Sequence, residues 1–295
     1  MAVKYNIKAD NKIIKCIDFD NIIDLYESIV PSIRCNRYGI LDEIKENHGW
    51  NGDYSLDETV EAMKFGFQKS TDYFLDNIKE IRSQDTTGKG TYLDYEGFAY
   101  DMGNVVEGVP ECCLNADLPA TKPCIKIIVD IAFSSWFSAR QMNNRGIAIA
   151  NLINTLIIHG YVIDLCFMRY NSQYDMDIMF TVQVNTEVLP ISVIAFMSSA
   201  DFFRKIGFMT TDLIREKPSE PGRGMSIMQS FILNKIKKED IFFIGGGYSN
   251  PELCSHLETV EDANNYLLHL FCIYCKDHKI KITFRDREEC NEYDE

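Results

Sequence analysis

The clearest pattern of apolar and polar positions lies between Cys124 and Tyr170. An apolar run rich in β-branched residues, IKIIVDIAF, comes first, a helix-length amphipathic stretch follows, and a second apolar run, YVIDLCFMRY, closes the segment. Two such runs around one helical pattern indicate a βαβ unit. The sequence therefore predicts an α/β fold with a mixed sheet that contains this unit.

Shorter patterns precede this unit. The run IIKCIDFDNIIDLYESIV predicts a strand followed by a helix, with Asp20 or Asn21 as the helix N-cap. Pro31 and Gly39 are expected to mark the end of that helix, because both residues interrupt regular structure. Residues 1–90 are thus predicted to form a mixed α/β region rich in helix.

A second helix is predicted to begin at a capping box. Ser55 and Glu58 have the required spacing of three residues. Gly66 lies in this helical pattern and marks either a close packing point or a break. The apolar residues at helical spacing are expected to face the core: Val60, Met63, Phe67, Phe74, Leu75 and Ile78.

Prolines and charged loops divide the rest of the chain. Residues 91–124 are predicted to be an extended, proline-containing connector, and residues 125–215 an α/β core that resembles an A domain. Residues 216–224, with two prolines and two glycines, are a predicted linker. Residues 225–295 are predicted to form a C-terminal α/β region with a strand ending in a glycine turn, a long helical pattern and an acidic tail.

Composition limits where the protein acts. Apolar residues make up 46% of the 295 residues, which predicts a packed core. No apolar run reaches about 18 residues and the N-terminus has no apolar leader pattern, so neither membrane insertion nor secretion is expected. The ten cysteines are scattered through apolar runs, as Cys166 is, and we expect reduced thiols in a cytoplasmic protein.

The net charge of −14 bears on the partner. Phosphate backbones repel an acidic chain, so direct binding to nucleic acid is disfavoured and a basic protein partner is favoured. Acidic residues cluster at 42–61, 252–262 and 286–295. Two clusters on one face would imitate the phosphate field expected by a DNA-binding protein, whereas the alternative is ordinary solvated helix faces and a disordered tail.

One strand end resembles a cation site. Asp130-Ile-Ala-Phe-Ser134 resembles the Asp-x-Ser-x-Ser motif of integrin-type A domains, in which a carboxylate and hydroxyls hold Mg²⁺. Here Ala132 replaces the first serine, which removes one ligand. The alternative is a strand-end aspartate that caps the following turn, and no metal is assigned.

Two further patterns carry little chemistry. His269, Cys272, Cys275 and His278 suggest zinc, but in a helix the two histidines would be about 13 Å apart, too far for one tetrahedral ion. The glycines at 245–247 offer amides for an anion but lack any phosphate-loop lysine, so a flexible turn explains them equally well.

No residue pattern predicts catalysis. None of the five histidines, nor any serine or cysteine, has the sequence context of a known nucleophile, and we expect no catalytic residues and no cofactor. Partner-contact candidates are Trp136 and Phe137, just past a strand end, where core packing is the alternative role. The acidic candidates are Glu258, Glu261 and Asp262.

Several segments together resemble a phage-encoded group of proteins, the anti-Gabija inhibitors carried by some temperate phages. The segments are Trp50 to Ser55 leading into the helix with Gly66, Glu107 to Cys112, Arg145-Gly146, and His159-Gly160. The length, the Asn, Lys and Ile usage and the acidic balance are also similar.

The resemblance implies a counter-defence protein of the host cytoplasm. It would bind the bacterial Gabija complex, a nuclease with a helicase-like partner, and block DNA binding or cleavage by occupancy, so no catalytic residue is carried over. An inhibitor of a symmetric assembly is expected to form a homo-oligomer. Two alternatives remain: an A-domain-like adaptor that binds a protein ligand through a degenerate cation site, and a hydrolase of nucleic acid or nucleotide.

Overall fold

The computed structural model describes just under three fifths of the chain, and every structural statement below refers to that part. The described ranges are 2–9, 12–34, 52–66, 91–94, 99–100, 113–116, 124–158, 161–172, 177–186, 191–215, 240–246 and 251–278.

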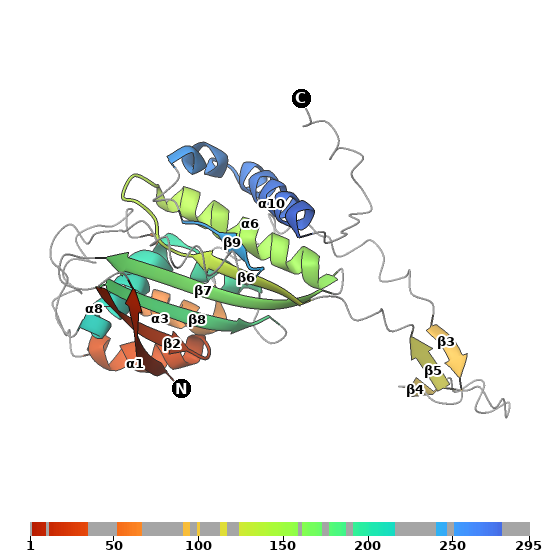
Figure 1. Ribbon diagram of the computed structural model, residues 1–295, viewed down its shortest axis with the longest axis horizontal. Coiled ribbons are helices and arrows are strands. Elements are labelled where there is room, and N and C mark those ends of the chain that lie inside the picture. The colour runs from red at the N-terminus through yellow and green to blue at the C-terminus, as the bar shows by residue number, and fades with distance from the viewer. Residues whose placement is uncertain are drawn as a thin grey trace.

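A six-stranded mixed sheet forms the centre of the fold (Figure 1). In spatial order its strands are β1 (Val3–Ala9), β2 (Lys12–Phe19), β8 (Asp177–Asn185), β7 (Val162–Ser172), β6 (Cys124–Asp130) and β9 (Phe242–Ile244). The pairs β1–β2 and β7–β8 are antiparallel, while β2–β8, β6–β7 and β6–β9 are parallel. The predicted βαβ unit is confirmed as β6, α6 and β7, and the α/β class with it.

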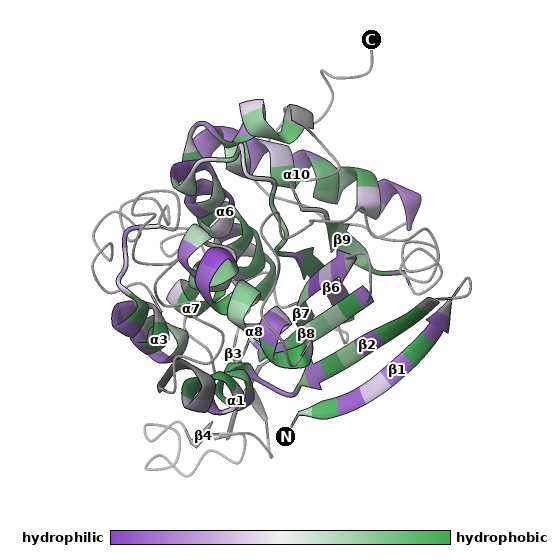
Figure 2. Cartoon of the chain, turned by 90° about the vertical axis from the view of Figure 1, so that its left-hand side faces the viewer, coloured by the Kyte–Doolittle hydropathy of each residue, from purple (hydrophilic) through white to green (hydrophobic). Residues whose placement is uncertain are grey.

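Helices cover one face of this sheet, and Figure 2 shows them gathered on one side of the strands. Apolar residues of every described α-helix belong to the core on that face. The described α-helices are α1 (Ile22–Arg34), α3 (Leu56–Phe65), α6 (Ala139–Ile158), α7 (Ile191–Met197), α8 (Phe208–Arg215) and α10 (Val260–Asp277). A π-helix, η3 (Phe202–Gly207), precedes α8, and a 3₁₀ helix, η4 (Pro251–Leu257), precedes α10.

Strand alternation sorts the apolar residues between the two faces. In β6, Ile125, Ile127 and Val129 join the large core under the helices, while Ile128 packs with a smaller cluster on the opposite face. Successive side chains of a strand point to opposite faces. On the second face of β6, Cys124 and Lys126 are exposed and Ile128 is half-buried, so this strand is fully buried only on the face that the helices cover.

Both helix starts predicted near the N-terminus are confirmed. Asn21 Oδ1 accepts the backbone N–H groups of Ile23 and Asp24, each at 2.9 Å, and so caps α1. Ser55 Oγ accepts the Glu58 amide at 3.3 Å, and the Glu58 carboxylate accepts the Ser55 amide at 2.7 Å.

The predicted exit of α1 was wrong. Pro31 lies inside the helix, which continues to Arg34, whereas a helix-interior proline was expected to end it. Gly66 acts in both expected ways, because it ends α3 with φ +74° and approaches α7 so closely that a Cβ would lie 2.4 Å from Ser192 Oγ.

The stretch predicted as an extended connector contains a second, antiparallel sheet. Its strands are β3 (Thr91–Asp94), β5 (Cys113–Ala116) and β4 (Ala99–Tyr100), with β5 in the middle (Figure 1). The six-stranded sheet itself takes strands from three of the predicted regions, 1–90, 125–215 and 225–295. The boundaries between those regions stay predictions. The predicted linker at 216–224 and the acidic tail lie outside the described residues, as do Gly39, Phe67 and the later apolar positions of the second helix.

Candidate binding edge at the carboxyl ends of β6 and β9

The edge of the sheet where β6 and β9 end has the geometry of a binding site. Both strands are parallel neighbours, so their carboxyl ends meet at one edge. The chain leaves β6 towards α6 and β7 on one side, while β9 pairs on the other side. In open α/β sheets ligands bind at such a point, where connections diverge from one strand.

Asp130 ends β6 and caps the turn that follows, as the alternative interpretation of the sequence had it. Its Oδ1 accepts the Ala132 N–H at 2.9 Å, and the Gly246 amide also donates to the carboxylate. Burial raises the pKa of Asp130 to about 6, although these amides and the nearby Arg145 favour the charged form. Ser134, four residues after Asp130, is buried, and its hydroxyl has no hydrogen-bond partner.

Arg145, in the second turn of α6, reaches the same strand ends. Its Nη2 donates to three carbonyl oxygens, those of Asp130 (3.1 Å), Ile244 (3.1 Å) and Gly245 (2.9 Å). Its Nε and Nη1 are buried without a hydrogen-bond partner, and its guanidinium lies 5.0 Å from the Phe133 ring centroid. Burial lowers the pKa of Arg145 to about 10, so the side chain remains protonated at neutral pH.

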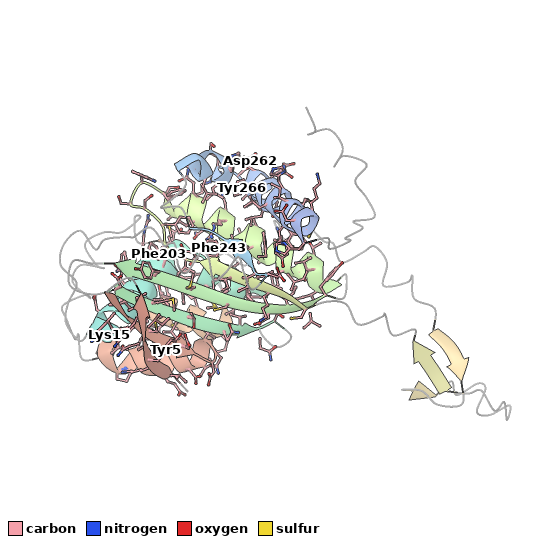
Figure 3. All side chains as sticks on the ribbon, viewed as in Figure 1. Tyr5, Lys15, Phe203, Phe243, Asp262 and Tyr266 are labelled. Atoms are coloured by element: carbon pink, nitrogen blue, oxygen red, sulfur yellow. The ribbon has the colours of Figure 1, made fainter. Side chains whose placement is uncertain are left out.

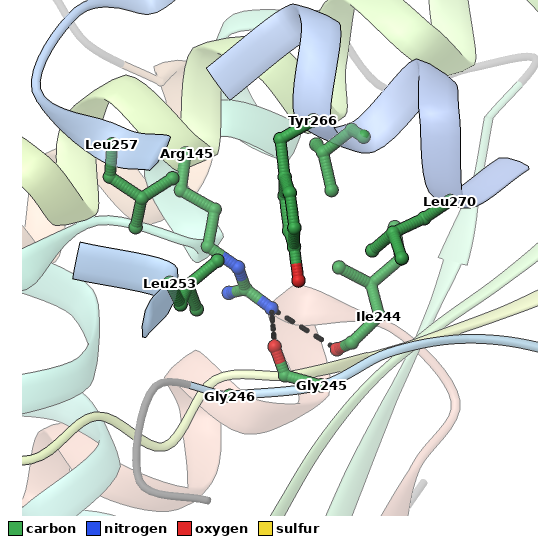
Figure 4. Close-up of a pocket in the computed structure, with 9 residues that line it drawn as sticks. Arg145, Ile244, Gly245, Gly246, Leu253, Leu257, Tyr266 and Leu270 are labelled. Carbon is green, nitrogen blue, oxygen red and sulfur yellow. Dashed lines mark hydrogen bonds between the residues drawn. The ribbon is translucent and has the colours of Figure 1, made fainter. Parts of the chain in front are cut away.

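A cavity of about 200 Å³ opens beside this guanidinium (Figure 4). Strand β9 and its glycines form one wall, and η4 with α10 forms the other. The lining residues are Arg145, Ile244, Gly245, Gly246, Leu253, Leu257, Tyr266, Leu267 and Leu270. The lining is thus about equally polar and apolar, and Arg145 is the only charged side chain among these residues.

Gly246 brings the ends of β6 and β9 together. A Cβ there would lie 2.1 Å from the Ala132 carbonyl oxygen and 2.9 Å from Asp130 Oδ2, so the backbones approach too closely for any side chain. The glycine turn, which the sequence offered as an anion site, therefore allows close packing of the two strands. The Gly246 N–H already donates to the Asp130 carboxylate. Gly247 lies outside the described residues.

Two polar side chains of α6 fix the start of α10. The Gln141 amide donates to the Cys254 carbonyl at 3.2 Å and to Glu258 Oε1 at 2.8 Å. Asn144 donates to the carbonyls of Leu257 (2.9 Å) and Glu258 (3.0 Å). These bonds hold the beginnings of the two helices side by side.

The expected partner-contact residues divide between surface and core. Trp136 is 64% exposed in the turn before α6, whereas Phe137 is 1% exposed and packs edge-to-face against Phe133. Phe137 therefore has the core role that was its alternative. Glu258, Glu261 and Asp262 are exposed where α10 begins, with Asp262 on its first turn (Figure 3). We call Trp136, Glu258, Glu261 and Asp262 the acidic–aromatic edge.

The His-Cys-Cys-His pattern lies along α10, as the helical interpretation required. Its members point into different environments: Cys275 is buried, with a pKa raised to about 12 chiefly by burial, while His269 is exposed. His278 lies 2.8 Å from the Tyr274 carbonyl and 3.3 Å from Asp240. In the described ranges no three candidate ligand side chains gather into a metal site. The thiols that the structure describes as free are those of Cys16, Cys124, Cys166, Cys254, Cys272 and Cys275.

A second buried charge cluster, which the sequence analysis missed, lies where η3 meets the segment before α3. Lys205 donates to the Asp201 carboxylate and to the Tyr54 carbonyl, and the Tyr54 amide donates to Asp201 at 3.0 Å. Gly52, at φ +95°, packs so tightly that a Cβ would lie 2.3 Å from Asp201 Oδ2. Burial raises the pKa of Asp201, and Lys205 pulls it back.

Comparison with known proteins places the chain in one family. A family model described as a domain of unknown function, DUF7192, matches residues 12–272, so the chain belongs to that family. The search of curated proteins and the search of solved structures gave no match. None of the helices that the structure describes is long and apolar enough to cross a membrane.

Proposed function

We propose that this member of the DUF7192 family is a counter-defence protein that acts by occupancy. It binds the bacterial Gabija complex in the host cytoplasm and blocks its DNA binding or cleavage without chemistry of its own. The nature of the partner rests on the sequence resemblance described above, and the mode of action rests on the charge and surface of the chain.

The observation that carries the proposal is the acidic–aromatic edge. An exposed tryptophan lies before the first turn of α6, and three exposed carboxylates lie at the start of α10. Gln141 and Asn144 join these two helix starts, so the groups are presented on a fixed frame. Large aromatic anchors supply much of the energy of protein interfaces, and complementary charges speed encounter.

Electrostatics favour a basic surface as the target. With a net charge of −14, the whole molecule attracts a positively charged DNA channel from a distance. Carboxylates on a fixed frame then compete with phosphates for the same lysines and arginines. Arg140, exposed in the first turn of α6, is a positive charge near the acidic–aromatic edge and would repel a basic partner locally.

The test is DNA cleavage by purified Gabija complex in the presence of the protein and two charge-reversal variants. The first variant is Glu258→Lys with Glu261→Lys. The matched control is Glu27→Lys with Glu61→Lys, which changes net charge equally but on the exposed faces of α1 and α3. We expect at least a tenfold loss of inhibition for the first variant and less than threefold for the control, as one or two lost charge pairs predict.

Trp136→Ala separates the aromatic part from the charge. The complex formed by this variant should dissociate about tenfold faster, with little change in its association rate. Unchanged cleavage and unchanged DNA binding at saturating protein would refute the proposal. Equal losses for both charge variants would refute the assigned surface while leaving occupancy in place.

One observation favours a second candidate, an A-domain-like adaptor that binds a protein ligand. The motif Asp130-x-Ala132-x-Ser134 lies at the carboxyl end of a strand flanked by two parallel neighbours, and the Ser134 hydroxyl is buried without a partner. This candidate predicts that partner capture requires Mg²⁺ and is lost in Asp130→Ala. The occupancy inhibitor keeps its partner in both conditions.

A further inference from the structure

We propose that the outer edge of strand β1 is a docking site for an extended, acidic segment of a partner protein, which pairs with β1 as an added strand of the sheet. This surface is separate from the acidic–aromatic edge and does not depend on the proposed function. Three observations carry the proposal: the open edge of β1, the lysines on one face of β1 and β2, and the exposed apolar side chains beside them.

Strand β1 is the outermost strand of the sheet in the described part of the chain, and Figure 2 shows it beside β2 at the margin of the sheet. It pairs with β2 over seven consecutive residues, without a bulge and without a proline. Residues 3–6 and Lys8 are exposed, so none of the described elements covers the strand at these positions. An edge that is not shielded by a bulge, a proline or a covering segment is a template for another strand.

One face of this edge is basic. Lys4, Asn6 and Lys8 alternate along that face of β1, and Lys15 of β2 lies opposite Asn6, between the two lysines. Lys4 and Lys8 are exposed and Lys15 is half-buried, and we call these three residues the lysine strip. The one acidic residue of the two strands, Asp18, is opposite Val3 on the other face. A positive strip in a chain of net charge −14 is a local feature that an acidic partner complements.

Apolar side chains beside the lysine strip offer packing for an added strand. Val3 and Tyr5 are 49% and 38% exposed on the other face of β1, and Ile13, on the lysine face of β2, is 55% exposed. The side chains of an added strand alternate between the two faces, so every second one lies beside the lysines and the others lie beside Val3 and Tyr5. The edge therefore fits a segment in which acidic and β-branched residues alternate.

The lysines disfavour a second copy of this chain as the occupant. In a two-fold pair of β1 edges, the lysine strips of both copies would lie on the same face of the joined sheet, and their like charges would repel. Lysines on an edge strand also discourage pairing with uncharged strands. The same lysines select an acidic strand, because specificity comes from repelling wrong partners as well as from attracting the right one.

Titration of the full chain with a capped peptide of sequence EVTVEVT tests the site, because its two glutamates can lie opposite Lys4 and Lys8 in either strand direction. The controls are KVTVKVT, with reversed charges, and EVPVEVT, in which proline removes a backbone donor. Backbone amide shifts of Lys4, Asn6 and Lys8 follow binding. We expect a Kd of about 0.1–1 mM for EVTVEVT and at least tenfold weaker binding of each control.

Three results of this titration would overturn the proposal. Binding of EVTVEVT that does not saturate would remove the site. Equal affinity for KVTVKVT would remove the selection for acidic residues. Equal affinity for EVPVEVT would leave charge attraction without strand pairing.

Two charge-reversal variants locate the peptide. Lys4→Glu with Lys8→Glu should invert the preference, so that KVTVKVT binds at least tenfold more tightly than EVTVEVT. The matched control, Lys64→Glu with Lys276→Glu, changes net charge equally at exposed positions of α3 and α10 and should change the preference less than threefold. Equal effects of the two variants would place the peptide elsewhere.

The same samples test the other occupants of the edge. Displacement of EVTVEVT by an oligothymidylate would assign the lysine strip to nucleic acid. A concentration-dependent dimer in sedimentation that the peptide dissociates would assign the edge to a second copy. Either result would overturn the proposal, and we expect neither.

Discussion

Two buried basic residues in this protein have opposite surroundings. Lys205 has a carboxylate partner and a carbonyl partner, and the Tyr54 amide completes the cluster. Arg145 meets carbonyl oxygens through one nitrogen, leaves two nitrogens unpaired and borders a cavity. In both places a glycine approaches an aspartate too closely for a side chain, Gly52 at Asp201 and Gly246 at Asp130.

The difference lies in the balance of hydrogen-bond donors and acceptors. A buried charge that is fully paired holds two segments together. A buried charge with unpaired donors has lost hydrogen bonds to water that the protein does not replace. Burial alone does not distinguish the two residues, because both are buried and charged.

The largest expected effect comes from breaking the paired cluster. Lys205→Met leaves the Asp201 carboxylate buried without its counter-charge and should lower the free energy of unfolding by about 3–5 kcal/mol. Urea denaturation measures the loss. Adding Asp201→Asn to the same chain should recover part of it, and a loss below about 1 kcal/mol for the single variant would contradict a structural role.

A smaller effect on the free energy of unfolding, of opposite sign, is expected at Asp130, where β6 ends. The folded protein binds a proton at Asp130 with a pKa of about 6, against 3.8 for the free side chain, so this group lowers stability as pH rises from about 4 to 6. Asp130→Asn removes the titration while retaining an acceptor for the Ala132 amide. It should raise the free energy of unfolding at pH 7 by up to about 2–3 kcal/mol and have little effect at pH 4.

Thermal unfolding of both proteins across that pH range is the measurement. If Asp130→Asn destabilises the protein at pH 7, the charged carboxylate is needed as the counter-ion of Arg145. Arg145 would then be a paired charge like Lys205, and the contrast between the two regions would fail.

The smallest effects come from two capping boxes, at the starts of α3 and α6. Ser55 caps α3 next to Tyr54. Ser138 caps α6: its Oγ accepts the backbone N–H of Gln141 at 3.1 Å, and its own backbone N–H donates to Gln141 Oε1 at 2.9 Å. Replacing either serine by alanine should cost about 1 kcal/mol in chemical denaturation. Only Ser138→Ala also frees Gln141, so only that variant should weaken inhibition of the partner. Equal inhibition by both would separate Gln141 from the acidic–aromatic edge.

Much of the fold followed from local patterns. The strand and helix periodicities of 124–170 and the capping box at Ser55 predicted their elements, because each depends on residues within one turn or strand. The pattern Ser138-x-x-Gln141 is a similar signal that was overlooked. Pro31 misled the prediction, because α1 continues to Arg34 past a residue that disfavours a helix interior.

The site was harder to predict because its parts are distant in sequence. Arg145 belongs to a helix that otherwise appears amphipathic, and nothing in its neighbourhood reveals contact with carbonyls a hundred residues further on. Asp130 was identified correctly as a strand-end residue, but its link to Gly246 requires knowledge that β9 pairs with β6. Sheet order is a global property, and local periodicity does not encode it.

The attachment of β9 has a consequence for local opening. This strand has three residues and pairs with one neighbour in the described sheet, so few backbone hydrogen bonds hold it in place. Arg145, from a helix, donates hydrogen bonds to the last carbonyls of both strands and so connects β9 to β6 by a single side chain. Amide hydrogen exchange in β9 should therefore report the loss of these bonds, at a lower free energy than opening of the whole sheet.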